Sequence, residues 1–323
     1  MRVAVCGEAL IDLIPAAEVP ANQRASASSW AAHNGGGPMT TAVALARLGC
    51  ETAFWGSLSS DVFGRQLAGW MEAAGVDLRA ARRPQGPTAL AVVESSPKGI
   101  SYTFHLQGSA TFQWDDTGLP TGGDDLWLHI GSLAAVLEPG ASALLDYLSR
   151  CGLPASFDIN VRPTVVGDQA DYWERIERVM VRVGAGGGIL RASDQDIAWL
   201  VGAVGDPDLD VIDVATDWAR TYGFSLVVVT LGDAGALAVK PDGRVSASGR
   251  FDVPVVDTVG AGDAFTAGFL SQWLRDPLDT EAALRRGNAA AALTCTRIAA
   301  DPPTRAEVDG FLAAHTEKSV PTV

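Results

Sequence analysis

Residues 257–268 read DTVGAGDAFTAG, with an apolar stretch at 251–256 before them and a helical pattern at 261–273 after them. Gly260 and Gly262 permit a tight turn and a close approach of the backbone to a ligand. The amides of residues 260–263 then point out of a helix N-terminus, where the helix dipole favours an anion. We therefore predict a strand, a glycine turn and a helix that together bind a phosphoryl group.

Asp263 lies in the same turn, beside the predicted anion site. A carboxylate there can take the proton of an attacking hydroxyl group, while fixed amide donors stabilise a phosphoryl group in transfer. The alternative is that Asp263 only caps the helix, which is common for an aspartate in a first turn. The full string is more specific than a lone GxGD, so we favour the catalytic interpretation.

Strand patterns and helix patterns alternate along most of the chain. Strands are expected at 1–6, 52–55, 125–130, 154–159 and 226–231, and helices at 39–48, 64–74, 261–273 and 281–296. The run LVVVTL at 226–231 is apolar on both faces, as a buried parallel strand should be. The alternation predicts one α/β domain, residues 1–315, with a mostly parallel sheet between helices on both sides, and a tail at 316–323.

Two segments with alternating side chains, 88–94 and 101–106, break this pattern and predict a hairpin. Residues 11–14 and the segment near Trp30 could pair with it. A small β-sheet drawn from about 10–32 and 86–108 would then cover a pocket as a lid. The alternative is an ordinary edge hairpin. Lids of this kind often pair face to face, so a homodimer through the lid is compatible with the sequence, which does not require it.

Composition excludes several classes of protein. Apolar residues make up 47% of the 323 residues, enough for a large core, and the net charge of −14 argues against broad binding to nucleic acid. No apolar run has membrane-spanning length and the start lacks a signal-peptide pattern, so we expect a cytoplasmic protein without membrane contact. The four cysteines lie far apart, which favours free thiols over a zinc site. No early GxGxxG supports a nicotinamide dehydrogenase.

The motif at 257–268 resembles the C-terminal signature DTxGAGDxFxxG of the ribokinase-like (PfkB-type) carbohydrate kinases, and every fixed position is matched. The resemblance implies a three-layer α/β/α sandwich with a small β-sheet lid. It also implies transfer of the γ-phosphoryl group of ATP to a sugar hydroxyl with the help of Mg²⁺. It assigns the catalytic base to Asp263 and the anion hole to Gly260, Ala261 and Gly262.

Three further segments resemble the sugar site of that family. They are GEALID at 7–12, GGGPMTTAVALARLG at 35–49, and DINVRP at 158–163, which looks like the family's DxNxR. The resemblance implies that the sugar contacts come from Asp12, Gly35, Gly36, Gly37, Thr40, Phe104, Asn160 and Arg162. Thr40 stands where the family usually has an asparagine, and a hydroxyl and an amide impose different hydrogen-bond patterns on a sugar.

Other segments resemble the family's nucleotide and cation sites. SDQD at 193–196 is similar to SxxE, TLGDAG at 230–235 is similar to TLGxxG, and a long helix follows at 281–296. The resemblance implies nucleotide contacts from Ser193, Thr230, Gly232, Gly235 and Asn288, an indirect Mg²⁺ contact from Asp196, and a monovalent-cation role for Asp257. The helix N-cap by Ser193 is an equally compatible role for that residue. The stretch at 297–304 is shorter than in the family, so activation by potassium is not carried over.

The acceptor is the least determined part of this hypothesis. DINVRP and the Ser193 segment look like the fructokinase branch, which favours fructose. A kinase for 2-keto-3-deoxygluconate is close behind, since Arg162 could pair with its carboxylate. A ribose or nucleoside kinase, and a catalytically silent sensor of sugar or nucleotide, stay open as alternatives.

Overall fold

The computed structural model describes residues 1–15, 29–96, 99–123 and 125–318. The strands of its large sheet are β1 (Arg2–Cys6), β4 (Thr52–Phe54), β7 (Leu126–Gly131), β8 (Ala155–Asp158), β9 (Ile189–Ser193), β10 (Leu226–Thr230), β11 (Ala236–Val239) and β12 (Val245–Ser248). The helices are α1 (Gly37–Arg47), α2 (Val62–Ala73), α3 (Gly140–Cys151), α4 (Gln169–Ala185), α5 (Asp194–Leu200), α6 (Val211–Tyr222), α7 (Ala261–Trp273), α8 (Thr280–Cys295) and α9 (Arg305–Ala314).

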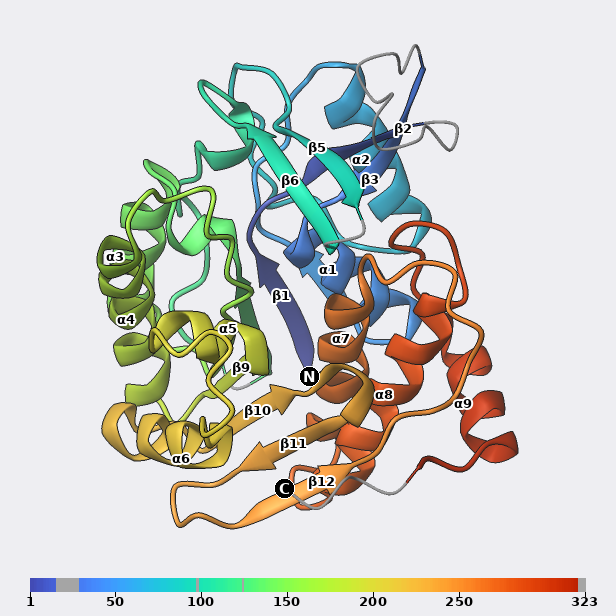
Figure 1. The fold of residues 1–323 in the computed structure, drawn as a ribbon. Coiled ribbons are helices and arrows are strands. Elements are labelled where there is room, and N and C mark those ends of the chain that lie inside the picture. Colours follow the sequence, from blue (N-terminus) through green and yellow to red (C-terminus); the bar gives the residue numbers. More distant parts are fainter. Residues whose placement is uncertain (16–28, 97–98, 124, 319–323) are drawn as a thin grey trace.

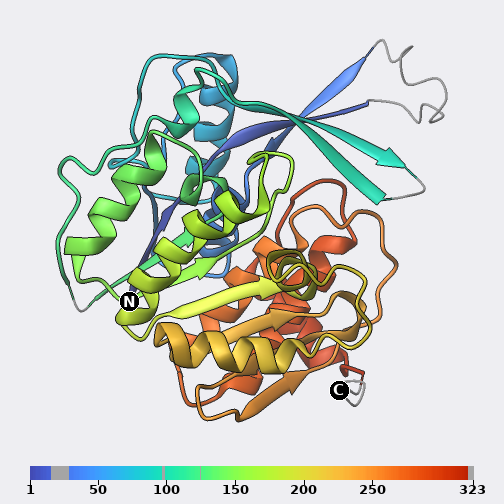
Figure 2. The ribbon, with the colours of Figure 1, turned by 60° about the vertical axis from the view of Figure 1, so that its left-hand side comes forward.

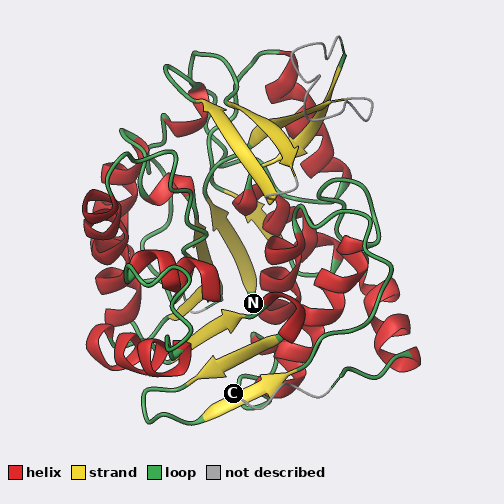
Figure 3. Ribbon diagram, viewed as in Figure 1, coloured by secondary structure: helices red, strands yellow, loops and turns green. Residues whose placement is uncertain are grey.

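The large sheet has eight strands in the order β12-β11-β10-β9-β8-β7-β1-β4. All neighbours from β10 to β4 pair in parallel, and only β11 and β12 are antiparallel. Helices α3 to α6 lie on one face, and α1, α7 and α8 lie on the other (Figures 1 and 3). The predicted three-layer α/β/α architecture is therefore confirmed.

A second sheet of four strands projects from this body (Figure 2). It consists of β3 (Trp30–Gly35), β2 (Leu10–Pro15), β5 (Leu90–Ser96) and β6 (Gly99–His105), in that order. The predicted hairpin is β5–β6, and β2 pairs with it in parallel while β3 pairs antiparallel with β2. The small sheet is thus confirmed, although residues 16–28 of its predicted N-terminal part lie outside the described residues.

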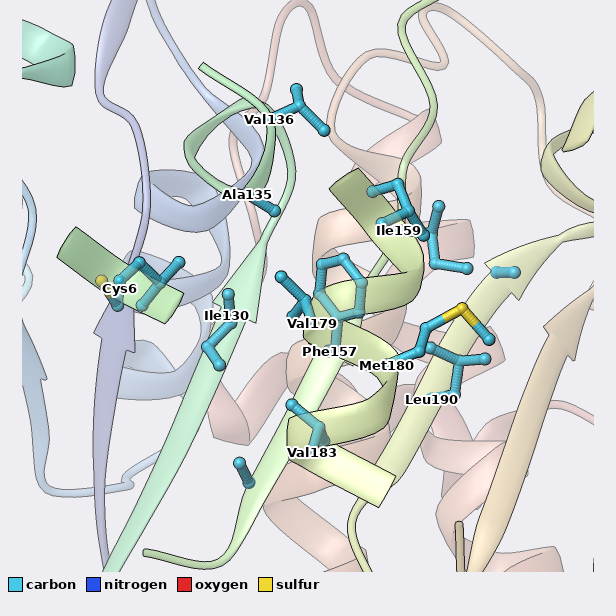
Figure 4. Packing of buried hydrophobic residues seen from close by; sticks show 14 of the residues in the cluster. Cys6, Ile130, Ala135, Val136, Phe157, Ile159, Val179, Met180, Val183 and Leu190 are labelled. Carbon is cyan, nitrogen blue, oxygen red and sulfur yellow. The ribbon is translucent and has the colours of Figure 1, made fainter. Parts of the chain in front are cut away.

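The core has two halves, one on each face of the large sheet. Strand alternation sends Ala4 and Cys6 of β1 into one hydrophobic cluster, and Val3 and Val5 into the other. Figure 4 shows the first of these halves, where side chains of α4 pack onto β7, β8 and β9.

One predicted element is wrong. Residues 251–256, which the sequence pattern assigns to a strand, form a loop. Phe251 is buried, but Val255 and Val256 are 63% and 59% exposed. Pro254 has no N–H to donate to a neighbouring strand, and the N–H of Val256 donates instead to the carbonyl of Cys295 at the end of α8.

The parallel strands β1, β7, β8 and β9 all end at the edge of the large sheet that lies under the small sheet. Ligands of open α/β sheets bind at such carboxyl ends. Within the described residues, none of the helices is both long enough and apolar enough to cross a membrane.

Candidate active site

The turn that precedes α7 has the backbone that its glycines predict. Gly260 is the N-cap of α7 with a φ of 78°, and a Cβ built on it would lie 2.6 Å from the Cβ of Ala300. In the described structure no side-chain hydrogen bond caps α7. Asp263, in the first turn of this helix, therefore does not serve as its cap, and its carboxylate is available for other chemistry.

Two cavities meet at Asp263. The larger cavity has a volume of about 590 Å³, and the smaller cavity has a volume of about 70 Å³. The residues that line both are Tyr102, Asn160, Arg162, Val259, Gly260 and Asp263. A group bound in one cavity can therefore reach a group bound in the other only past Asp263 and the glycine turn.

All eight residues predicted for the sugar site line the smaller cavity. They come from β2, β3, β6, the start of α1 and the segment after β8: Asp12, Gly35, Gly36, Gly37, Thr40, Phe104, Asn160 and Arg162. A Cβ on Gly35 would lie 2.3 Å from Oδ2 of Asp12, so glycine is required there for the carboxylate to fit. The fold brings these distant segments together as expected.

Asn160 and Arg162 hold each other in place. Asn160 has a φ of 43°, in the left-handed region that asparagine tolerates better than most residues. Nη1 of Arg162 donates to Oδ1 of Asn160 at 2.6 Å, and Oγ of Ser132 donates to the carbonyl of Asn160 at 3.1 Å. The guanidinium also lies 5.7 Å from the centre of the Tyr102 ring, a cation–π distance.

Three carboxyl groups line the smaller cavity: those of Glu8 and Asp12 are buried, and that of Asp263 is partly buried. Burial, followed by the negative charge of Asp158, raises the pKa of Asp263 to about 6, against the opposing charges of Arg162 and Arg191. Burial raises the pKa of Asp12 to about 7 and that of Glu8 to about 7. A carboxyl with a pKa near the working pH is suited to general acid–base chemistry.

The larger cavity extends from Asp263 toward α5. Besides the predicted residues that it shares with the smaller cavity, it is lined by Ser193, Asp196 and Gly262. Ser193 and Asp196 form a capping box at the start of α5, so the N-cap role of Ser193 is confirmed. Ala261 belongs to the same turn, between the two glycines, but does not line either cavity.

Asp196 fits an indirect contact with Mg²⁺ better than direct coordination. Its Oδ1 accepts from the N–H of Val161 at 2.8 Å, and its Oδ2 accepts from N and Oγ of Ser193 at 2.8 and 2.7 Å. No group of three or more acidic, histidine or cysteine side chains that could hold a metal occurs in the described part of the chain. Mg²⁺ keeps several waters and takes phosphate oxygens as ligands, so Asp196 would reach it through water.

Four residues predicted for the nucleotide line neither cavity: Thr230, Gly232, Gly235 and Asn288. Oγ1 of Thr230 accepts from Nη2 of Arg191 at 2.7 Å. Gly232 and Gly235 belong to the turn after β10, with φ values of 56° and 99°. Nδ2 of Asn288 lies 3.0 Å from the carbonyls of Ser248 and Gly249, and so ties α8 to the end of β12.

Asp257 stabilises the loop that leads into the glycine turn. Its Oδ1 accepts from the N–H of Val259 at 3.1 Å, and its Oδ2 accepts from the N–H of Ala299 at 2.9 Å. Both carboxylate oxygens thus have protein donors that link residues 257–259 to the segment after α8. The monovalent-cation role of Asp257 stays a prediction.

Several lining residues were missed by reasoning from sequence: Glu8, Tyr102, Ser132, Arg191, Gln195 and Trp199. Arg191 carried a usable signal, since a lone arginine interrupts the otherwise uncharged strand ILRAS. Glu8 likewise follows an apolar strand directly. Neither signal indicates a role without the surrounding fold.

Comparison with known proteins agrees with this geometry. The model of the pfkB family of carbohydrate kinases matches residues 1–306, and the chain belongs to this family. Its fold and enzyme class, a carbohydrate kinase, are those that the motif at 257–268 predicts.

Relatives and solved structures lie in the same family. The chain is 34% identical to a fructokinase of Rhizobium leguminosarum bv. trifolii, with 87% of this chain and 85% of the relative covered. It resembles the crystal structure of fructokinase from Vibrio cholerae O395 with fructose, ADP and calcium ion bound, with a TM-score of 0.81, 26% identity, and 96% and 98% coverage. It also resembles aminoimidazole riboside kinase from Salmonella enterica, with a TM-score of 0.81, 27% identity, and 98% and 100% coverage.

Proposed function

We propose that the protein transfers the γ-phosphoryl group of ATP to a hydroxyl group of fructose. The observation that carries the proposal is the place of Asp263, where the smaller cavity and the larger cavity meet beside the glycine turn. The fructokinase names of the relatives support the acceptor.

In this proposal the sugar occupies the smaller cavity with one hydroxyl beside Asp263. The carboxylate of Asp263 accepts the proton of that hydroxyl group while the hydroxyl oxygen of the sugar attacks the γ-phosphorus. The bond from the γ-phosphorus to the bridging oxygen breaks, and ADP leaves on the side of the larger cavity. The amides at the N-terminus of α7, residues 260–263, stabilise the charge of the group in transfer. Mg²⁺, when bound, would neutralise phosphate charge, and Asp196 would hold its water.

The electrostatics of the smaller cavity favour a neutral acceptor over a sugar acid. Among its described lining residues, three are acidic, namely Glu8, Asp12 and Asp263, and one is basic, Arg162. The guanidinium of Arg162 already donates to Asn160. An acceptor carboxylate would therefore meet more like charge than opposite charge, which disfavours 2-keto-3-deoxygluconate.

We further propose that the small sheet acts as a lid. Tyr102 and Phe104 belong to β6 and line the smaller cavity, so movement of this sheet would open or close it. Closure over the sugar would exclude water and limit hydrolysis of ATP. A homodimer through this sheet stays a prediction, which the molar mass measured by light scattering would check.

The test of the acceptor is a comparison of kcat/KM for fructose, ribose, adenosine and 2-keto-3-deoxygluconate with ATP and Mg²⁺. We expect fructose to rank first. If any of the others exceeds fructose by tenfold or more, the fructose assignment is wrong while the kinase assignment stands. If 2-keto-3-deoxygluconate ranks first, Arg162→Ala should remove most of that preference.

A further inference from the structure

Arg191 is a buried arginine directly under the glycine turn. It lies on β9, is 8% exposed, and lines the larger cavity. Its Nη2 lies 3.2 Å from the position that a Cβ on Gly262 would take. The planar guanidinium therefore packs against the backbone of the turn that precedes Asp263.

The partners of Arg191 connect four elements of the site. Nη1 donates to the two carboxylate oxygens of Asp158 on β8, at 3.0 and 3.3 Å, and Nη2 donates to Oγ1 of Thr230 on β10 at 2.7 Å. Oγ1 of Thr266 lies 3.0 Å from Oδ2 of Asp158. Thr266 and Asp263 are three residues apart on α7, so they lie on the same face of that helix. The ion pair thus reaches the helix that carries the proposed base.

The charged groups that face Asp263 at close range are one carboxylate and two guanidiniums, with Asp12 farther along the smaller cavity. Asp158, Arg162 and Arg191 face Asp263 from β8, the segment after β8, and β9. Asp158 raises the pKa of Asp263, and the two arginines lower it. If Asp158 lost its partner, two buried carboxylates would face each other, and such a pair takes up a proton.

Within the described residues, Nε of Arg191 is buried and has no hydrogen-bond partner. A buried ion pair is weak evidence for stability, because desolvation of the two charges offsets their attraction. The placement of the pair beside the reacting groups calls for a different explanation.

We propose that Arg191 is a positioning residue of phosphoryl transfer, which neutralises Asp158 beneath Gly262 so that Asp263 keeps its negative charge at the junction of the two cavities. The inference rests on the proposed function and adds a residue to the same site. Arg191 acts through Asp158 and Asp263, and it does not have to touch the sugar or the phosphoryl group.

The experiment compares three variants of Arg191 with a matched control. Arg191→Met removes the charge at similar length, Arg191→Lys keeps the charge without the planar fork, and Asp158→Asn/Arg191→Met removes both charges. The control is Arg286→Met on α8. Arg286 is also buried, pairs with Asp309 at 2.7 Å, and has a buried nitrogen without a partner, but it lines neither cavity.

Two readouts are taken as a function of pH: kcat/KM, and the ¹³C chemical shift of the Asp263 carboxyl group, assigned by its loss in Asp263→Asn. For Arg191→Met we expect kcat to fall about 100-fold or more, with a smaller change in KM. The acid limb of the pH profile of kcat/KM should move to higher pH by about one unit. Arg191→Lys should keep more activity. The double variant should return the acid limb to the wild-type position or below, since the raising effect of Asp158 on Asp263 exceeds the lowering effect of Arg191.

The proposal is overturned if Arg191→Met keeps the acid limb of the wild-type pH profile and a kcat within threefold of the wild-type value. It is also overturned if the acid limb of the double variant moves as far as that of Arg191→Met. A shift in Arg286→Met equal to that in Arg191→Met would also overturn it, because loss of any buried arginine would then suffice. If Arg191→Met fails to fold, the lysine and double variants decide the question. The carboxyl titration needs no turnover, so a wild-type protein that rejects fructose contradicts only the proposed function.

Discussion

Gly37 and Asp263 lie so close together that a Cβ built on Gly37 would be 2.8 Å from Oδ1 of Asp263. The same atom would be 3.0 Å from Nδ2 of Asn160. The start of α1 therefore packs directly against the first turn of α7, and Oγ1 of Thr41 donates to the carbonyl of Asp263 at 3.4 Å. The three segments that carry the site leave no room for even one methyl group at residue 37.

We therefore expect Gly37→Ala to lower kcat/KM for the sugar about 100-fold or more, because a displacement near 1 Å at reacting groups has that effect. The methyl group would push Asp263 or Asn160 aside. Gly69→Ala is the control, since Gly69 lies within α2 with nothing within 4 Å of its Cβ position. The control should keep full activity and gain up to about 1 kcal/mol of stability. Equal activity of the two variants would contradict the packing described for Gly37.

Asp263→Asn should lower kcat by ~10²–10⁴-fold, as expected for the loss of a general base. The amide is nearly the same size but cannot take the proton of a hydroxyl group. Binding of ATP, measured by titration calorimetry, should change little, because the larger cavity and the turn amides are kept. A variant that retains near-full kcat would show that Asp263 is not the base.

Gly260→Ala tests the turn itself against a matched glycine. Gly260 and Gly75 have φ values of 78° and 86°, so alanine is strained at both. A Cβ on Gly260 would also lie 2.6 Å from the Cβ of Ala300, whereas nothing lies within 4 Å at Gly75. Gly75→Ala should lose about 1 kcal/mol of stability, and Gly260→Ala should lose more because of the contact with Ala300. Only Gly260→Ala should also lose phosphoryl transfer, by about 100-fold, in a coupled assay of ADP release.

Glu8→Gln tests the burial of the smaller cavity through stability. Burial raises the pKa of Glu8 from 4.5 to about 7, so the folded protein binds the proton more tightly than the unfolded chain. Stability from this group is therefore present at low pH, falls as pH rises from about 4.5 to 7, and is lost above that range. Glutamine keeps the acceptor for the N–H of Ala134 but has no proton to lose.

Glu8→Gln should consequently be more stable than the wild type at pH 8, by up to about 3 kcal/mol, with a smaller gain at pH 5.5. Urea unfolding at both pH values gives the comparison. Glu72→Gln, at an exposed position of α2, is the control for the removal of one negative charge. A gain for Glu8→Gln that is the same at both pH values would show that Glu8 is not protonated on folding.

Local patterns predicted most of the fold, and the resemblance to the carbohydrate kinases supplied the eight residues expected at the sugar site. The helix at 261–273 has the predicted bounds, the hairpin and the parallel strands lie where the patterns place them, and the eight residues line the smaller cavity. The elements of the fold depend on glycine, apolar periodicity and strand ends, which act over short distances in the chain. The strand predicted at 251–256 failed because an apolar composition does not supply a neighbouring strand to pair with.

The amino-acid sequence alone determined the class of protein, through the match of residues 257–268 to a family signature, and the glycine turn at 257–263, because the conformation of that turn depends on its local residues. Only the tertiary structure decided that Arg191 pairs with Asp158 below that turn. It also decided that the carboxyl groups of Glu8 and Asp12 are buried away from solvent. It decided as well that Asn288 donates to Ser248 and Gly249 and lines neither of the two cavities at Asp263. Desolvation and ion pairing depend on which segments pack together, and segments far apart in the chain do not reveal this by their local pattern.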